Sequence, residues 1–80
     1  MAAAAQSITC LAPGQAAVVS EVEAPEDVRV RLLELGFVTG TPVELVRFAP
    51  LGDPVELRLR RSHLTLRRHE AEFVHVRPQA

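Results

Sequence analysis

The sequence predicts one small, mainly β domain: a barrel of about five short strands with a single helix. The chain has 80 residues, which is room for one domain. Its hydrophobic fraction is 48%, with three phenylalanines and no tyrosine or tryptophan, so the core is expected to be aliphatic. Short segments of alternating apolar and polar residues recur between turn signals, and closing such strands into a barrel removes the exposed edges of a flat sheet.

The domain is expected to span residues 8–77, with residues 1–7 and 78–80 as tails. Residues 1–7 are mostly alanine and offer nothing to bury. Residues 8–11 suit a short extended piece, which a turn containing proline and glycine ends.

A strand is predicted from Ala16 to Glu23. Its apolar residues Val18 and Val22 are expected on the core face, and Glu21 and Glu23 on the opposite face.

A helix is predicted over residues 26–35. Pro25 suits the first helical position, where its missing N–H needs no partner, and the two acids that follow favour the positive end of the helix dipole. Gly36 can adopt the positive φ that commonly ends a helix. The expected buried stripe of the helix consists of Val28, Leu32 and Leu35.

The C-terminal half is predicted to be β. Residues 43–48 are mainly apolar, and the apolar residues change from one face of the strand to the other in mid-run, which indicates a bulge or a sharp bend. The loop 49–54 holds two prolines and a glycine. Residues 55–60 alternate strictly and residues 63–66 return, which predicts a hairpin with its turn at 61–62.

A short 3₁₀ turn near 67–71 and a last strand over 73–77 complete the prediction. Val74 and Val76 are expected to point inward. This order of elements, with short connections and one helix over an open end, describes a small SH3-like β-barrel.

The charge of the chain narrows the function classes. Nine arginines with no lysine stand against ten acidic residues, giving a net charge of −1. This near neutrality argues against a protein that binds nucleic acid mainly through phosphates, so no nucleic-acid partner is expected. The densest cationic cluster consists of Arg58, Arg60, Arg61, Arg67 and Arg68. It is either a solvated face or a docking surface for an acidic partner or RNA.

No feature of the sequence indicates an enzyme or a secreted protein. Cys10, Ser20 and Ser62 lie outside any nucleophile motif with a partnered base, and the glycines form no phosphate-binding loop, so we expect no enzyme. A single cysteine gives no sign of an oxidising compartment. The N-terminus resembles neither a signal peptide nor a membrane span. We therefore expect a cytoplasmic protein that reaches a membrane only through a partner.

Three histidines raise the question of a metal site. The candidate ligands are His63, His69, His75, Cys10, Glu70 and Glu72. No two of the histidines and the cysteine have the spacing of a structural zinc site, so we expect neither an intrinsic metal site nor a cofactor. A weak surface site, such as His69 with Glu72 shared between two chains, and a metal-binding carrier are the alternatives.

Four motifs in fixed order resemble the FeoA family, ferrous iron transport protein A. They are RLLELGF at residues 31–37, GTPV at 40–43, APLGDP at 49–54 and LTLRRHEA at 64–71. The resemblance covers nearly the whole predicted domain. The family fold is an SH3-like barrel with a helical insertion, in agreement with the elements predicted above.

The resemblance implies a cytoplasmic, non-enzymatic accessory protein of Fe(II) uptake. Its partner would be FeoB, a membrane Fe(II) transporter with a cytosolic GTPase domain. By position, the helix motif and the 49–54 loop become candidate contact surfaces, and the arginines near the hairpin tip join them. The candidate contact residues are Leu32, Leu33, Leu35, Leu51, Gly52, Asp53, Pro54, Arg60 and Arg61.

Alternatives to these contacts remain. Leu32 and Leu35 also fit the buried stripe of the helix, and Leu51 could either project from its loop or fold back on the core. A nucleic-acid or other interaction module using the Arg58–Arg68 surface is the alternative function. Weak self-association, through strand edges or through an exposed Phe73 or Leu51, is a further alternative.

Overall fold

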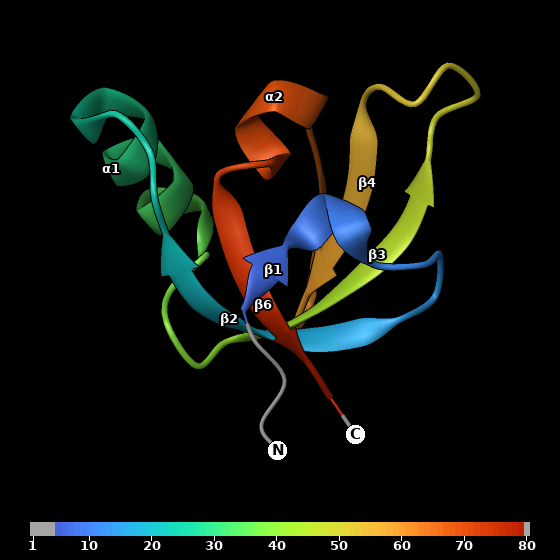
Figure 1. Ribbon diagram of the computed structural model, residues 1–80, viewed down its shortest axis with the longest axis horizontal. Coiled ribbons are helices and arrows are strands. Elements are labelled where there is room, and N and C mark those ends of the chain that lie inside the picture. Colours follow the sequence, from blue (N-terminus) through green and yellow to red (C-terminus); the bar gives the residue numbers. More distant parts are fainter. Residues whose placement is uncertain (1–4, 80) are drawn as a thin grey trace.

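The computed structural model describes residues 5–79 as a six-stranded antiparallel sheet with two helices (Figure 1). The strands lie in the order β1-β6-β2-β3-β4-β5. The elements are β1 (Gln6–Ser7), the 3₁₀ turn η1 (Ile8–Cys10), β2 (Ala16–Val22), α1 (Glu26–Leu35), β3 (Pro42–Phe48), β4 (Val55–Leu59), β5 (Ser62–Leu66), α2 (Arg68–Ala71) and β6 (Val74–Pro78). In Figure 1, α1 stands to the left of the curled sheet and α2 lies between α1 and β4.

The sheet is strongly curled but does not close, which corrects the closed barrel that we expected. In the part of the chain that the structure describes, the edge strands β1 and β5 do not pair with each other. The curl surrounds a core that is aliphatic except for one aromatic ring. Its largest fully buried side chains are Phe37, Ile8, Leu32, Leu45, Leu57, Val19, Val55, Val74 and Val76. The predicted inward positions Val74 and Val76 of β6 are confirmed by this set, and the alternate residues Val55 and Leu57 of β4 belong to it as well.

Two bulges bend the sheet, and only one of them was predicted. The pairing of β3 with β4 shifts between Leu45 and Arg47, as the parity change indicated. The pairing of β2 with β6 shifts between Val19 and Glu21, which leaves Ser20 as the extra residue.

The bulge in β2 corrects the expected core face of that strand. Before it, Ala17 and Val19 are buried and Val18 is only partly covered; after it, Val22 packs against the core. Val22 was therefore placed correctly and Val18 was not. Residues 16–19 are all apolar, so the sequence does not show which alternate residues of this segment face the core.

Helix α1 has the predicted bounds but a different buried stripe. Pro25 occupies the N-cap rather than the first helical position. Leu32 is fully buried and Val28 packs against the core, whereas Leu35 is 42% exposed. The helix ends at Leu35 because Gly36 takes a left-handed φ of 114°.

The chain reversal after Leu35 explains its exposure. The N–H groups of Gly36 and Phe37 donate to the carbonyls of Leu33 and Leu32, at 3.0 and 3.1 Å. This cap turns the chain back under the helix, and Phe37 fills the core beside Leu32 in the place that we had assigned to Leu35.

Local details of the turns also differ from expectation. The β4–β5 turn consists of Arg60 and Arg61 rather than residues 61–62, and Arg60 has a positive φ of 46°. The segment near 67–71 is one α-helical turn, α2, instead of a 3₁₀ turn. The 3₁₀ turn is η1, where we expected an extended piece.

The chain ends of the domain join the sheet. Gln6 and Ser7 pair with β6, and the N–H of Gln79 donates to the carbonyl of Ala16 at 3.2 Å. The tail expected at 1–7 thus contains a short strand, while residues 1–4 and 80 lie outside the described residues. Within residues 5–79, neither helix has the length and apolar character needed to cross a bilayer.

The helix offers a direct test of this core. Leu32→Ala should lower the free energy of unfolding by about 2–5 kcal/mol, because it opens a cavity at a fully buried position. Leu35→Ala, in the same helix but partly exposed, should cost less than about 1 kcal/mol. Urea denaturation of both variants measures the difference, and equal costs would contradict the burial described here.

Candidate functional site

An open groove of about 430 Å³ lies beside the C-terminal end of α1 and the tip of the β4–β5 hairpin. We call it the hairpin-tip groove and define it by Leu35, Gly36, Val38, Leu59, Arg60 and Ser62. Two candidate contact residues, Leu35 and Arg60, are thus brought together from segments 25 positions apart in the sequence.

The walls of the groove combine exposed apolar groups with the cation of Arg60, which Arg61 follows in the chain. Leu35 and Val38 are 42% and 50% exposed. Arg60 and Arg61 are exposed, and among residues 5–79 no carboxylate lies within 4.0 Å of either guanidinium. Apolar area beside unpaired positive charge is typical of a surface that binds an acidic, partly apolar partner.

Backbone contacts fix the shape of the groove. A Cβ on Gly36 would lie 3.3 Å from Cδ1 of Leu59, so glycine lets the helix end approach the hairpin closely. The 38–41 segment is bound to β2: Gly40 donates to the Val19 carbonyl at 2.8 Å, and Val19 donates to the Thr41 carbonyl at 2.9 Å. These contacts hold both backbone segments beside the groove in place, so the groove does not lie beside a loose loop.

The β3–β4 loop, residues 49–54, is the second candidate surface. Leu51 is 96% exposed, so it projects from the loop and does not fold back on the core. The carboxylate Oδ1 of Asp53 accepts a hydrogen bond from the backbone N–H of Arg68 at 3.0 Å, which holds the loop against the start of α2. The guanidinium of Arg68 also donates to the Gly52 carbonyl at 3.4 Å and lies 5.4 Å from the centre of the Phe48 ring.

These two surfaces are separate. The β3–β4 loop and the β4–β5 turn lie at opposite ends of β4 (Figure 1), and the groove is lined by residues at the β4–β5 turn. The seven residues of β3 span about 20 Å at the usual rise of a strand. Of the remaining candidates, Leu32 is buried and unavailable, and Leu33 is half-buried.

The predicted arginine surface is interrupted by carboxylates. Arg58 Nη1 lies 3.4 Å from Glu44 Oε1, and Arg68 Nε lies 3.9 Å from Glu72 Oε2. Only Arg60, Arg61 and Arg67 stay without a carboxylate partner among these five arginines within the described residues. The continuous cationic face considered from the sequence is thus reduced mainly to the hairpin tip.

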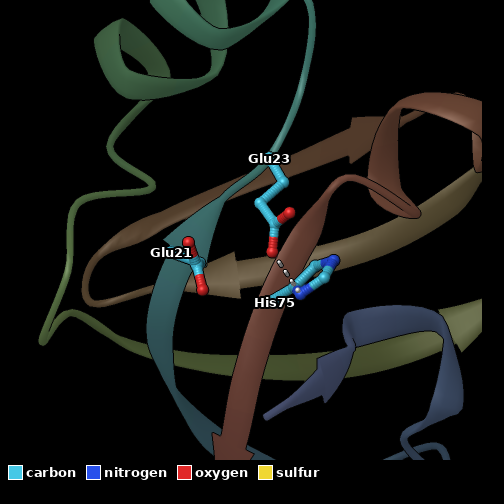
Figure 2. Close-up of side chains that lie close together, drawn as sticks. All are labelled: Glu21, Glu23 and His75. Atoms are coloured by element: carbon cyan, nitrogen blue, oxygen red, sulfur yellow. Dashed lines mark ion pairs between the residues drawn. The ribbon is translucent and has the colours of Figure 1, made fainter.

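A third group of side chains was not foreseen as a unit. Figure 2 shows Glu21 and Glu23 of the β2 end beside His75 of β6. Their candidate ligand atoms all lie within 4.8 Å of one another, and Nδ1 of His75 lies 3.6 Å from Oε1 of Glu23. Residues 5–79 contain no other such group of three histidine, cysteine or acidic side chains. About 50 residues separate its two halves in the sequence, and no sequence signal pairs β2 with β6.

Comparison with known proteins gives one consistent family. The FeoA domain family matches residues 7–78 of the chain. A fusion protein of Fe(2+) transport protein A and the Fe(2+) transporter FeoB from Porphyromonas gingivalis is 41% identical over 63 residues. That match covers 79% of this chain and 8% of the fusion protein, so the chain spans a small part of that relative's length.

Solved structures agree with the sequence match. FeoA from Chlorobium tepidum is 43% identical with a TM-score of 0.87, over 94% of this chain and 71% of that one. The zinc complex of FeoA from Stenotrophomonas maltophilia, an SH3 domain protein, is 33% identical with a TM-score of 0.77, over 92% and 89% of the two chains. The open, curled sheet described above is accordingly an SH3-like fold.

The anchoring of the β3–β4 loop can be tested at Asp53. Asp53→Ala should lower the free energy of unfolding by about 0.5–2 kcal/mol, because the N–H of Arg68 loses its acceptor. Faster amide hydrogen exchange in residues 49–54 should accompany the loss. Asp53→Asn keeps a side-chain oxygen and should restore most of both properties. Unchanged exchange in the alanine variant would show that the loop is held by other contacts.

Proposed function

The chain belongs to the FeoA family, and on this premise we propose that it is a cytoplasmic, non-catalytic accessory protein of Fe(II) uptake. Its proposed partner is the cytosolic part of a FeoB-type membrane transporter. The membrane is reached only through this partner.

The fusion protein of Porphyromonas gingivalis is the observation that carries the proposal. It joins an FeoA part, similar to this chain, and FeoB in one polypeptide. A shared polypeptide holds two parts at a high effective concentration, which favours contact between them even where their intrinsic affinity is low. The fusion therefore supports an association of FeoA with FeoB, and docking by this chain is the simplest form of it.

We infer that the hairpin-tip groove is the centre of the contact surface. Its exposed Leu35 and Val38 supply apolar area, and the unpaired Arg60 supplies a donor for a carboxylate of the partner. The β3–β4 loop lies within the width of a standard interface, which buries about 800 Å² on each partner. Leu51 is therefore a candidate second contact on the same partner.

Nucleic-acid binding draws less support from the geometry. Arg58 and Arg68 are engaged by neighbouring glutamates. Strands β4 and β5, which flank Arg60 and Arg61, also carry no phenylalanine that could stack on a base.

Binding to the cytosolic domain of FeoB tests the proposed surface. Leu35→Gln should weaken the association at least about tenfold, because it places a polar group at the centre of the apolar patch. Leu51→Gln should weaken it by a smaller factor. Val30→Gln is the matched control, since Val30 has the same 42% exposure as Leu35 but does not line the groove. Calorimetric titration with folded variants gives the affinities.

Fe(II) uptake in a deletion strain complements the binding measurement. Cells that carry the Val30→Gln variant should take up Fe(II) like cells with the parent protein, and cells that carry Leu35→Gln should not. Normal uptake in the deletion strain, together with no association between the parent protein and FeoB, would refute the proposed function.

A further inference from the structure

The bulge at Ser20 determines which side chain faces His75. Val19 pairs with Val76, so a regular ladder would place Ser20 opposite His75; with one extra residue, Glu21 stands there instead. The carbonyl of the extra residue accepts a hydrogen bond from the hydroxyl of Thr39 at 3.1 Å, which holds the bulge in place. Bulges commonly redirect side chains in this way beside functional sites.

Glu23 is held on the same side of the sheet. Its backbone N–H donates to the carbonyl of Phe73 at 3.0 Å, which continues the pairing of the two strands beyond β2. Because side chains of residues two apart in a strand share a face, Glu23 lies beside Glu21. Together they place two carboxylates around one imidazole (Figure 2).

These two glutamates differ from most others in the chain. Five of the eight glutamates lie within 4.0 Å of an arginine: Glu26, Glu44, Glu56, Glu70 and Glu72. Within residues 5–79, neither Glu21 nor Glu23 has such a partner, and the nearest basic group to Glu23 is the imidazole of His75. Two neighbouring carboxylates without a cation repel each other, and a bound divalent cation would relieve that repulsion.

The geometry points to a site for a divalent first-row transition-metal ion, with Glu21, Glu23 and His75 as its ligands. Two carboxylates and an imidazole suit Fe²⁺, Mn²⁺ or Zn²⁺. Ligand atoms bound at about 2.0–2.2 Å from one ion lie within about 4.4 Å of each other, so the present separations close with small rotations of exposed side chains. Water completes the coordination.

The exposure of the ligands determines how the proposed site binds an ion. The side chains of His75 and Glu23 are 30% and 61% exposed, so an ion can enter and leave from solvent. Such a site binds reversibly and is not required for folding, in contrast to a closed structural zinc site. The proposal differs from our expectation of no intrinsic metal site, and the proposed site shares no residue with the hairpin-tip groove.

The chain offers a matched control for this site. Nε2 of His63 lies 3.3 Å from Oε1 of Glu56, a second exposed pair of imidazole and carboxylate. That carboxylate is already engaged by Arg47 at 3.1 Å, and no third ligand accompanies it in the part of the chain that the structure describes. His63→Gln therefore removes an imidazole without touching the proposed site.

Anaerobic calorimetric titration with Fe²⁺ and NMR titration of the ¹⁵N-labelled protein with Mn²⁺ test the proposal. We expect one ion per chain, with the amide signals of residues 21–23 and 75 broadened first by Mn²⁺. His75→Gln and Glu23→Gln should each lower the affinity at least about tenfold, and His63→Gln should leave it unchanged. The variants' spectra outside the site should overlay with that of the parent, which separates lost binding from lost structure.

Three results would overturn the proposal: no saturable binding by the folded parent, broadening that begins around His63 or His69, or His75→Gln binding like the parent. Because the measurement uses the metal alone, its outcome is independent of whether the chain docks on FeoB.

Discussion

Strand β2 is the element through which the two parts of the sheet are joined, because it pairs with β6 on one side and with β3 on the other. Its seven residues must satisfy two conflicting demands. The first half has to bury Ala17 and Val19, and the end has to keep Val22 on the core while the chain leaves for α1. One extra residue at the bulge resolves the conflict. The same residue sets which polar side chains stand together on the outside.

The helix shows how a second constraint is met. An 80-residue chain can form only a small core, so each large buried side chain contributes a substantial part of the stability. Gly36 ends α1 in a left-handed conformation and delivers Phe37 to that core. Leu35 is then left at the surface, beside the hairpin tip. The exposed apolar patch that we assign to partner binding is thus a direct result of the way in which the core is filled.

The accuracy of the sequence predictions follows the strength of the local signals. The bounds of helix α1 were predicted correctly because Gly36 marks its end, and strand β4 because its apolar and polar residues alternate strictly. The residues of β2 that face the core were predicted incorrectly, because its first four residues are all apolar and show no alternation. Arg60 in a left-handed turn has no sequence signature, since glycine or asparagine usually occupies such a position.

The candidate sites divide in the same way. The 49–54 loop could be recognised from its prolines and its family motif, and its projecting Leu51 agrees with one of the two alternatives. The groove and the Glu21, Glu23 and His75 cluster depend on tertiary contacts between distant segments. Neither could be assembled from residues that lie up to about 50 positions apart without knowledge of the strand order.

The left-handed Arg60 carries a thermodynamic consequence of its own. A side chain other than glycine in this conformation costs roughly 1–2 kcal/mol, and the present φ is 46°. The hairpin tip is therefore less stable with arginine than it would be with glycine at position 60. The chain instead keeps a guanidinium on the wall of the groove. At position 60, glycine would favour the stability of the fold and arginine provides a surface charge. The sequence has arginine.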